Sequence, residues 1–313
     1  MPDLWLLTYS FAAAAVCASA ACIVVLLPLH AKPPDAASVP HFRVLCSFLV
    51  GGLAGLSVQG AIPAVPPVTG LDRWLLIGLP WLLIADVAGS FLRRWQPARY
   101  LRSSAALIVA PVILHGSVHL EAAPALRVLS ELTVGGLLTV TIAACVMLVM
   151  TTLADRPRHH SANLVPMLHA GLAVLTLQVA AATVMLGGWI RGGAAALPVA
   201  GSCIGLLTAA GVSRRPLVAA LVYRWSIWSL CGVVLLGHFF GRLGLVQSTL
   251  LLSAAAIPEL VPLPQKPGTN ATHTFAACLL TLLLLALVLI PAICTFMDRM
   301  SPLLAAEQTT AHS

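Results

Sequence analysis

The sequence predicts an all-α fold, a polytopic bundle of transmembrane helices. Charged residues make up only 9% of the 313 residues, while hydrophobic residues make up 59%, and the mean hydropathy is +0.98. The charges lie in short gaps between apolar runs, and a run of about 20 apolar residues is long enough to cross the ~30 Å hydrocarbon layer. No polar stretch approaches the ~100 residues of a soluble domain. We therefore expect one integral-membrane domain over residues 1–300 and a short polar C-terminal tail over residues 301–313.

Nine apolar runs are long enough to be membrane spans. In chain order they cover residues 4–29, 44–61, 74–92, 104–120, 132–153, 163–188, 195–212, 217–240 and 274–297. The apolar run over residues 243–257 is short for a span and is followed by Pro258 and Glu259. It is interpreted as a re-entrant or interfacial helix, or alternatively as a tenth span.

The distribution of Lys and Arg predicts the orientation, because cytoplasmic loops of membrane proteins are enriched in these residues. One set of alternate gaps contains Lys32, Arg43, Arg93, Arg94, Arg99, Arg102, Arg156, Arg158, Arg214, Arg215 and Arg299. The opposite set contains Arg73, Arg127, Arg191, Arg242 and Lys266. Eleven residues against five place the N-terminus outside. The C-terminus is then cytoplasmic with nine spans, and with ten spans Lys266 and Arg299 exchange sides without changing the count.

Small residues at four-residue spacing predict close helix packing, since in lipid they allow two backbones to approach each other. The pairs are Gly51 and Gly55, Gly188 and Gly192, Gly201 and Gly205, and Gly237 and Gly241.

Three ionisable side chains are predicted well inside spans, where such groups are costly and often functional. They are Asp86 in the third span, His169 in the sixth and Arg224 in the eighth. Counting along each helix from its cytoplasmic end places all three roughly 9 to 12 Å deep. We expect Asp86 and Arg224 to form an ion pair with His169 nearby. The pair either fixes the register of the bundle or belongs to a substrate or proton site.

A second group of ionisable residues is predicted toward the outer face. His115 and His119 share one face of the fourth span, and His238 lies at comparable depth in the eighth. Three imidazoles could hold a divalent metal, or two could ligate a haem iron. The alternative is that they are hydrogen-bonded interfacial residues. A zinc-protease motif is excluded, because Gly116 stands where a catalytic Glu would be required.

No motif in the sequence names a reaction, so an enzyme is not indicated. The basic net charge of +7 is explained by the orientation signal, and no nucleic-acid partner is expected. Three functions remain open: a permease or small-molecule carrier using Asp86, Arg224 and His169, a structural or assembly subunit with partner membrane subunits, and a haem- or metal-binding redox subunit. The expected location is a bacterial inner membrane, with the lipid bilayer as the main partner.

Overall fold

The computed structural model describes residues 3–26, 38–92, 95–115, 134–155, 164–213, 216–260 and 270–310. Within these ranges all regular elements are helices and no strand is present, which confirms the predicted all-α class. The helices are α1 (Leu4–Leu26), α2 (Ser38–Val58), α3 (Gly70–Arg73), the π-helix η2 (Trp74–Gly78), α4 (Leu79–Phe91), α5 (Trp95–Leu114), α6 (Val134–Ala154), α7 (Leu164–Leu186), α8 (Ile190–Ser213), α9 (Pro216–Phe239), α10 (Leu245–Leu260) and α11 (Asn270–Thr310).

Among the described residues, seven helical stretches are long and apolar enough to cross a membrane. They are Leu4–Val25, His41–Val58, Gly70–Phe91, Pro166–Leu186, Ile190–Ser213, Leu217–Phe239 and Thr274–Ser301. Two shorter apolar helices are Leu138–Ala154 and Leu245–Leu260. This set indicates an integral membrane protein with several passes through the bilayer.

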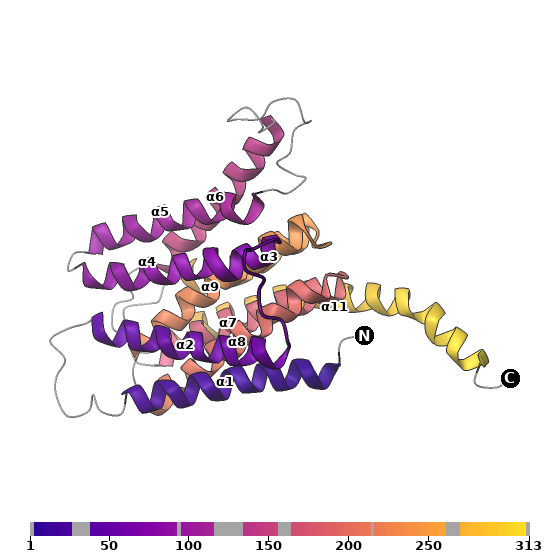
Figure 1. Ribbon diagram of the computed structural model, residues 1–313, viewed down its shortest axis with the longest axis horizontal. Coiled ribbons are helices and arrows are strands. Elements are labelled where there is room, and N and C mark those ends of the chain that lie inside the picture. The colour runs from indigo at the N-terminus through magenta and orange to yellow at the C-terminus, as the bar shows by residue number, and fades with distance from the viewer. Residues whose placement is uncertain are drawn as a thin grey trace.

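The helices run side by side along one axis, with α1 at one edge of the bundle and α5 and α6 at the opposite edge (Figure 1). α1 packs against α2 and α8, and α5 packs between α4 and α6. α9 is central, since 83% of its apolar window is buried, compared with 22% for α1 and 28% for α11. The largest fully buried side chains include Tyr223, Trp225 and Trp228 of α9.

The third predicted span begins earlier than expected, at Gly70. Thr69 caps this helix: its side chain accepts from the backbone of Asp72, and Asp72 accepts in return from the backbone of Thr69. Such a reciprocal box satisfies two N–H groups at a helix start. The π-helical turn η2 lies just before Pro80, which cannot donate to the helix ladder, so a local change in winding is expected there.

The short apolar run near residue 250 forms a helix, α10, that packs against α9, α7 and α11. α10 starts directly after the end of α9, whereas Glu259 near its other end lies 3.7 Å from His169 at the start of α7. Near the start of α9, the hydroxyl of Tyr223 donates to the carbonyl of Ala255 at 3.3 Å. α10 is therefore antiparallel to α9.

The last helix, α11, contains 41 residues and packs against α10 and α7. At 1.5 Å per residue it is about 60 Å long, roughly twice the hydrocarbon thickness. It projects beyond the other helices at the same end of the bundle as the N-terminus (Figure 1). The region predicted as a separate polar tail from residue 301 continues this helix as far as Thr310.

Two of the four predicted glycine pairs lie where helices touch closely. A Cβ atom on Gly51 would lie 2.6 Å from the carbonyl oxygen of Ala14, and one on Gly201 would lie 2.6 Å from that of Phe11. These contacts join α1 to α2 and α8. Gly188 is different, because its positive φ of 103° places it in the turn after α7 rather than in a helix interface.

Candidate functional site

The structure brings together Asp86 and Arg224, two of the three inner residues predicted from the sequence. Asp86 lies near the end of α4 and Arg224 near the start of α9, and these two helices pack against each other. The guanidinium Nη1 of Arg224 donates to Oδ1 of Asp86. Asp86 is fully buried, so this contact is shielded from water.

Two further residues complete a network of four ions. Arg102 of α5 places its Nε 2.8 Å from Oδ1 of Asp86 and its Nη1 3.3 Å from Oδ1 of Asp155. Arg224 places its Nε 2.8 Å from the same oxygen of Asp155. Asp155 directly follows α6, so the network joins α4, α5, α6 and α9. We call Asp86, Arg102, Asp155 and Arg224 the ion network.

The ion network is buried and its formal charges balance. The carboxylate side chains are 0% exposed, and the side chains of Arg102 and Arg224 are 7% and 14% exposed. Two positive and two negative charges leave no net charge when all four groups are ionised. Burying charges is tolerable only with such pairing, because an unpaired ion in a low-dielectric interior costs several kcal/mol.

Asp155 is in an unfavourable position on its own. It follows the last turn of α6, where the helix dipole places partial negative charge, and its backbone N–H donates to Thr151 at 3.0 Å. Two guanidinium groups offset this repulsion. Its second oxygen, Oδ2, is buried and has no hydrogen-bond partner among the described residues. That oxygen is an acceptor to which the described residues supply no donor.

Neighbouring residues of α9 connect the network to three other helices. Trp225 donates from Nε1 to Oδ2 of Asp86 at 2.9 Å, and its ring packs edge-on against Phe48 of α2. Tyr223 contacts α10, as described above. One turn further along, Trp228 donates to the hydroxyl of Thr151 on α6 at 3.1 Å. A single segment of α9 thus contacts α2, α4, α6 and α10.

His169, the third inner residue predicted, has a different ionic partner. Its Nδ1 lies 3.7 Å from Oε1 of Glu259, and both side chains are 6% exposed. This distance suits an ion pair but is too long for a hydrogen bond. The pair joins α7 to α10 at the end of the bundle that also contains the ion network. Glu259 was noted in the sequence only as the residue that follows the short apolar run.

The outer histidines do not form a ligand set in the described part of the chain. His115 is exposed at the end of α5, and its carbonyl accepts from Arg73. His238 contacts the carbonyl of Leu243 through Nδ1 at 3.0 Å, and His119 lies outside the described residues. Among the described residues, no group of three His, Cys, Asp or Glu could hold a metal ion.

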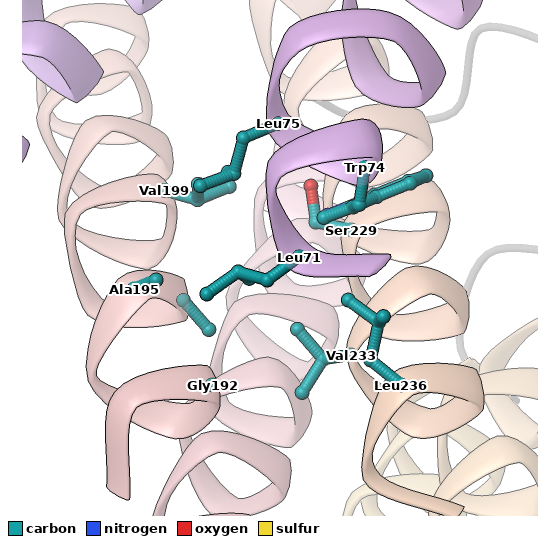
Figure 2. Close-up of a pocket in the computed structure, with 10 residues that line it drawn as sticks. Leu71, Trp74, Leu75, Gly192, Ala195, Val199, Ser229, Val233 and Leu236 are labelled. Carbon is teal, nitrogen blue, oxygen red and sulfur yellow. The ribbon is translucent and has the colours of Figure 1, made fainter. Parts of the chain in front are cut away.

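An internal cavity lies between the start of the third helical stretch, α8 and α9 (Figure 2). Leu71, Trp74 and Val233 line it together with Ser229, whose buried hydroxyl has no partner among the described residues. Its volume is about 10 Å³. That is close to the minimum for one water molecule, so this cavity is too small for a substrate.

Sequence reasoning missed Arg102 and Asp155. Arg102 was counted among the basic residues that set orientation, and Asp155 lies just beyond a predicted span. The sequence does show that Asp155, an acidic residue among basic ones at this end of the bundle, needs a cationic partner. Counting the depth of residues along each helix separately could not identify which arginine is that partner.

The site can hold charge, exchange ion-pair partners and admit a hydrogen-bond donor at Asp155 Oδ2. Its described residues include no nucleophile with an adjacent base, which a hydrolytic reaction would require. Comparison of the chain with protein-family models, curated proteins and solved structures gives no match.

Proposed function

We propose that this protein is a membrane carrier for a small molecule or ion, and that the ion network closes one end of its pathway. The observation that supports this proposal is the position of the four ions. They lie at one end of a multi-helix bundle and hold together α4, α5, α6 and α9. A closure made of ion pairs can open at a small cost in free energy, because water can solvate each charge once the helices separate.

The proposed topology has ten crossings with both termini outside. The course of α10 supports this count, since it runs from the end of α9 to the start of α7. The bias of Lys and Arg supports the same orientation, with the ion network at the cytoplasmic end. A bacterial inner membrane is the proposed location. α10 has 16 residues and is about 24 Å long, so it spans the layer only where the layer is locally thinned.

The proposed closure is tested by measuring whether a water-soluble reagent reaches a buried residue that lies deeper in the bundle than the ion network. Thr151 lies one turn before Asp155 on α6 and is fully buried. We would place Thr151→Cys in a background without the eight natural cysteines and measure its labelling by a charged, membrane-impermeant thiosulfonate reagent. With the network intact we expect protection, and with Asp86→Asn and Arg224→Gln together we expect labelling at least tenfold faster.

The double substitution removes one charge of each sign, so the formal charge balance of the site is kept. Val212→Cys, at an exposed position next to the end of α8, is the control, and its labelling rate should not depend on the network. A cooperative melting transition well above the labelling temperature would show that the labelled protein is folded. Slow labelling of Thr151→Cys in a folded double variant would contradict the proposed closure.

A second candidate function is a structural or assembly subunit. The balanced charges of the ion network favour it, because the four groups stabilise one another without any ligand. In that case the folded double variant should lose its partner subunits. Copurification of a fixed partner with the wild type, lost in the double variant, would support this candidate.

A further inference from the structure

We propose that a groove between α5 and α6 is a binding site for the headgroup of an anionic phospholipid. The groove has a volume of about 450 Å³ and is lined by Gln96, Arg99, Tyr100, Ser103, Leu148 and Thr152. This inference is independent of the proposed carrier function, because it concerns the lipid-facing surface of the bundle.

The four lining residues of α5 form one stripe on the helix. Positions 96, 99, 100 and 103 are three or four residues apart, so their side chains project on the same side. Arg102 lies outside this stripe and its side chain contacts the ion network. α5 therefore has a buried cationic side directed into the bundle and a polar side directed out of it.

The chemistry of the stripe suits a phosphate group. Arg99 can donate two parallel hydrogen bonds to phosphate oxygens, and Gln96, Tyr100 and Ser103 supply additional donors. On α6, the hydroxyl of Thr152 already donates to Val149 at 2.8 Å, so its oxygen is left as an acceptor. A glycerol headgroup has both the phosphate that the stripe requires and hydroxyl donors for Thr152.

The surface next to the groove favours a lipid over a soluble phosphate. Toward the middle of the bundle the same side of α5 presents Leu107, which is 40% exposed. α6 contributes Leu148 to the groove and the exposed Val149 beside it. Polar lining at the end of the helices thus changes to apolar surface within about two turns, which matches a headgroup followed by acyl chains. Tyr100, 73% exposed, has the amphipathic ring typical of the membrane interface.

The test measures lipid retention by the purified full-length protein. Protein in mild detergent would be incubated with phosphatidylglycerol, with phosphatidylethanolamine or with free glycerol 3-phosphate, and bound molecules would be counted by native mass spectrometry. We expect the wild type to retain phosphatidylglycerol in preference to phosphatidylethanolamine. Arg99→Gln should weaken retention about tenfold, as expected for the loss of a charge-assisted pair of hydrogen bonds.

Arg242→Gln is the matched control, because Arg242 is exposed at the other end of the bundle. Its retention should stay within about twofold of the wild type. Arg99→Lys, which keeps the charge but not the planar fork, should give an intermediate value. Tyr100→Phe removes one donor from an exposed ring and should reduce retention about threefold, which keeps the proposal testable if Arg99→Gln fails to fold.

Three results would overturn the proposal. The first is that Arg99→Gln retains as much phosphatidylglycerol as the wild type. If Arg99→Gln does not fold, the same result for Tyr100→Phe overturns the proposal. The second is equal retention of the anionic and zwitterionic lipids by the wild type. The third is displacement of phosphatidylglycerol by free glycerol 3-phosphate, which would make the groove a soluble phosphate site.

Discussion

Arg102 and Arg224 contact the same two oxygens, Oδ1 of Asp86 and Oδ1 of Asp155, from two different helices. Each carboxylate therefore keeps one cationic partner if the other arginine is removed. The network differs in this respect from an isolated ion pair, in which one substitution leaves a lone buried charge.

The first prediction concerns the coupling of Asp86 with Arg224. Asp86→Asn should lower the free energy of unfolding by about 3 kcal/mol or more, because both guanidinium groups lose a partner in a buried site. Arg224→Gln should cost less, since Arg102 still contacts both carboxylates. The loss of unfolding free energy in the double variant should be about 1–3 kcal/mol smaller than the sum of the two single losses. Unfolding in mixed micelles measures all three variants, and strict additivity would show that the contact has no energetic importance.

The second prediction compares the two carboxylates. Asp155→Asn should be less damaging than Asp86→Asn, by about 1–2 kcal/mol in the free energy of unfolding. Asp86 also accepts a hydrogen bond from Trp225, whereas Oδ2 of Asp155 has no partner among the described residues and Asp155 lies at the negative end of α6. The two single variants would be compared in one unfolding series. A larger loss for Asp155→Asn would show that Asp155 is the central anion of the network.

The third prediction concerns the packing of α1, α2 and α8. Gly51→Ala should destabilise the protein by about 2–3 kcal/mol, because the added carbon would lie 2.6 Å from the backbone oxygen of Ala14. Gly52→Ala, at the adjacent position, is the control. Its nearest neighbour would be the hydroxyl of Ser202 at 3.8 Å, so it should have little effect. Thermal melting in detergent compares the two variants, and equal melting temperatures would contradict close packing at Gly51.

The fourth prediction concerns the side of the membrane on which the chain ends. With ten crossings the C-terminus lies on the same side as the N-terminus, outside. A C-terminal alkaline phosphatase fusion should be active and a fusion to green fluorescent protein should be dark, because the first requires an exported position and the second an internal one. Fusions after residue 241 should give the same outside pattern, and those after residue 215 the opposite. A bright fluorescent fusion at the C-terminus would restore the nine-span topology.

Composition and run length were sufficient to predict the helical class, since both depend only on the energy of apolar residues in lipid. The same local pattern predicted the helix over residues 243–257 but left its course undecided. That course depends on contacts with distant residues, such as Ala255 with Tyr223 and Glu259 with His169.

The site was predictable only in part for a similar reason. Asp86 and Arg224 stood out because each lies inside an apolar run, where a charge requires a partner. Arg102 and Asp155 lie at the ends of such runs, where charges are ordinary, so nothing local distinguished them. For His169, the depth counted along one helix could not determine that its side chain meets Glu259 of α10.

The equal numbers of positive and negative charges in the ion network bear on the response to the membrane potential. Moving one elementary charge through a potential of 100 mV changes the energy by about 2.3 kcal/mol. Asp86, Arg102, Asp155 and Arg224 carry no net charge together, so a motion that moves them as one body does no electrical work. Sliding of α9 along the membrane normal relative to α6, in contrast, would move Arg224 and Asp155 by different distances through the field and would be voltage-dependent. Voltage sensitivity would therefore distinguish movement of the intact bundle end from sliding of α9 past α6.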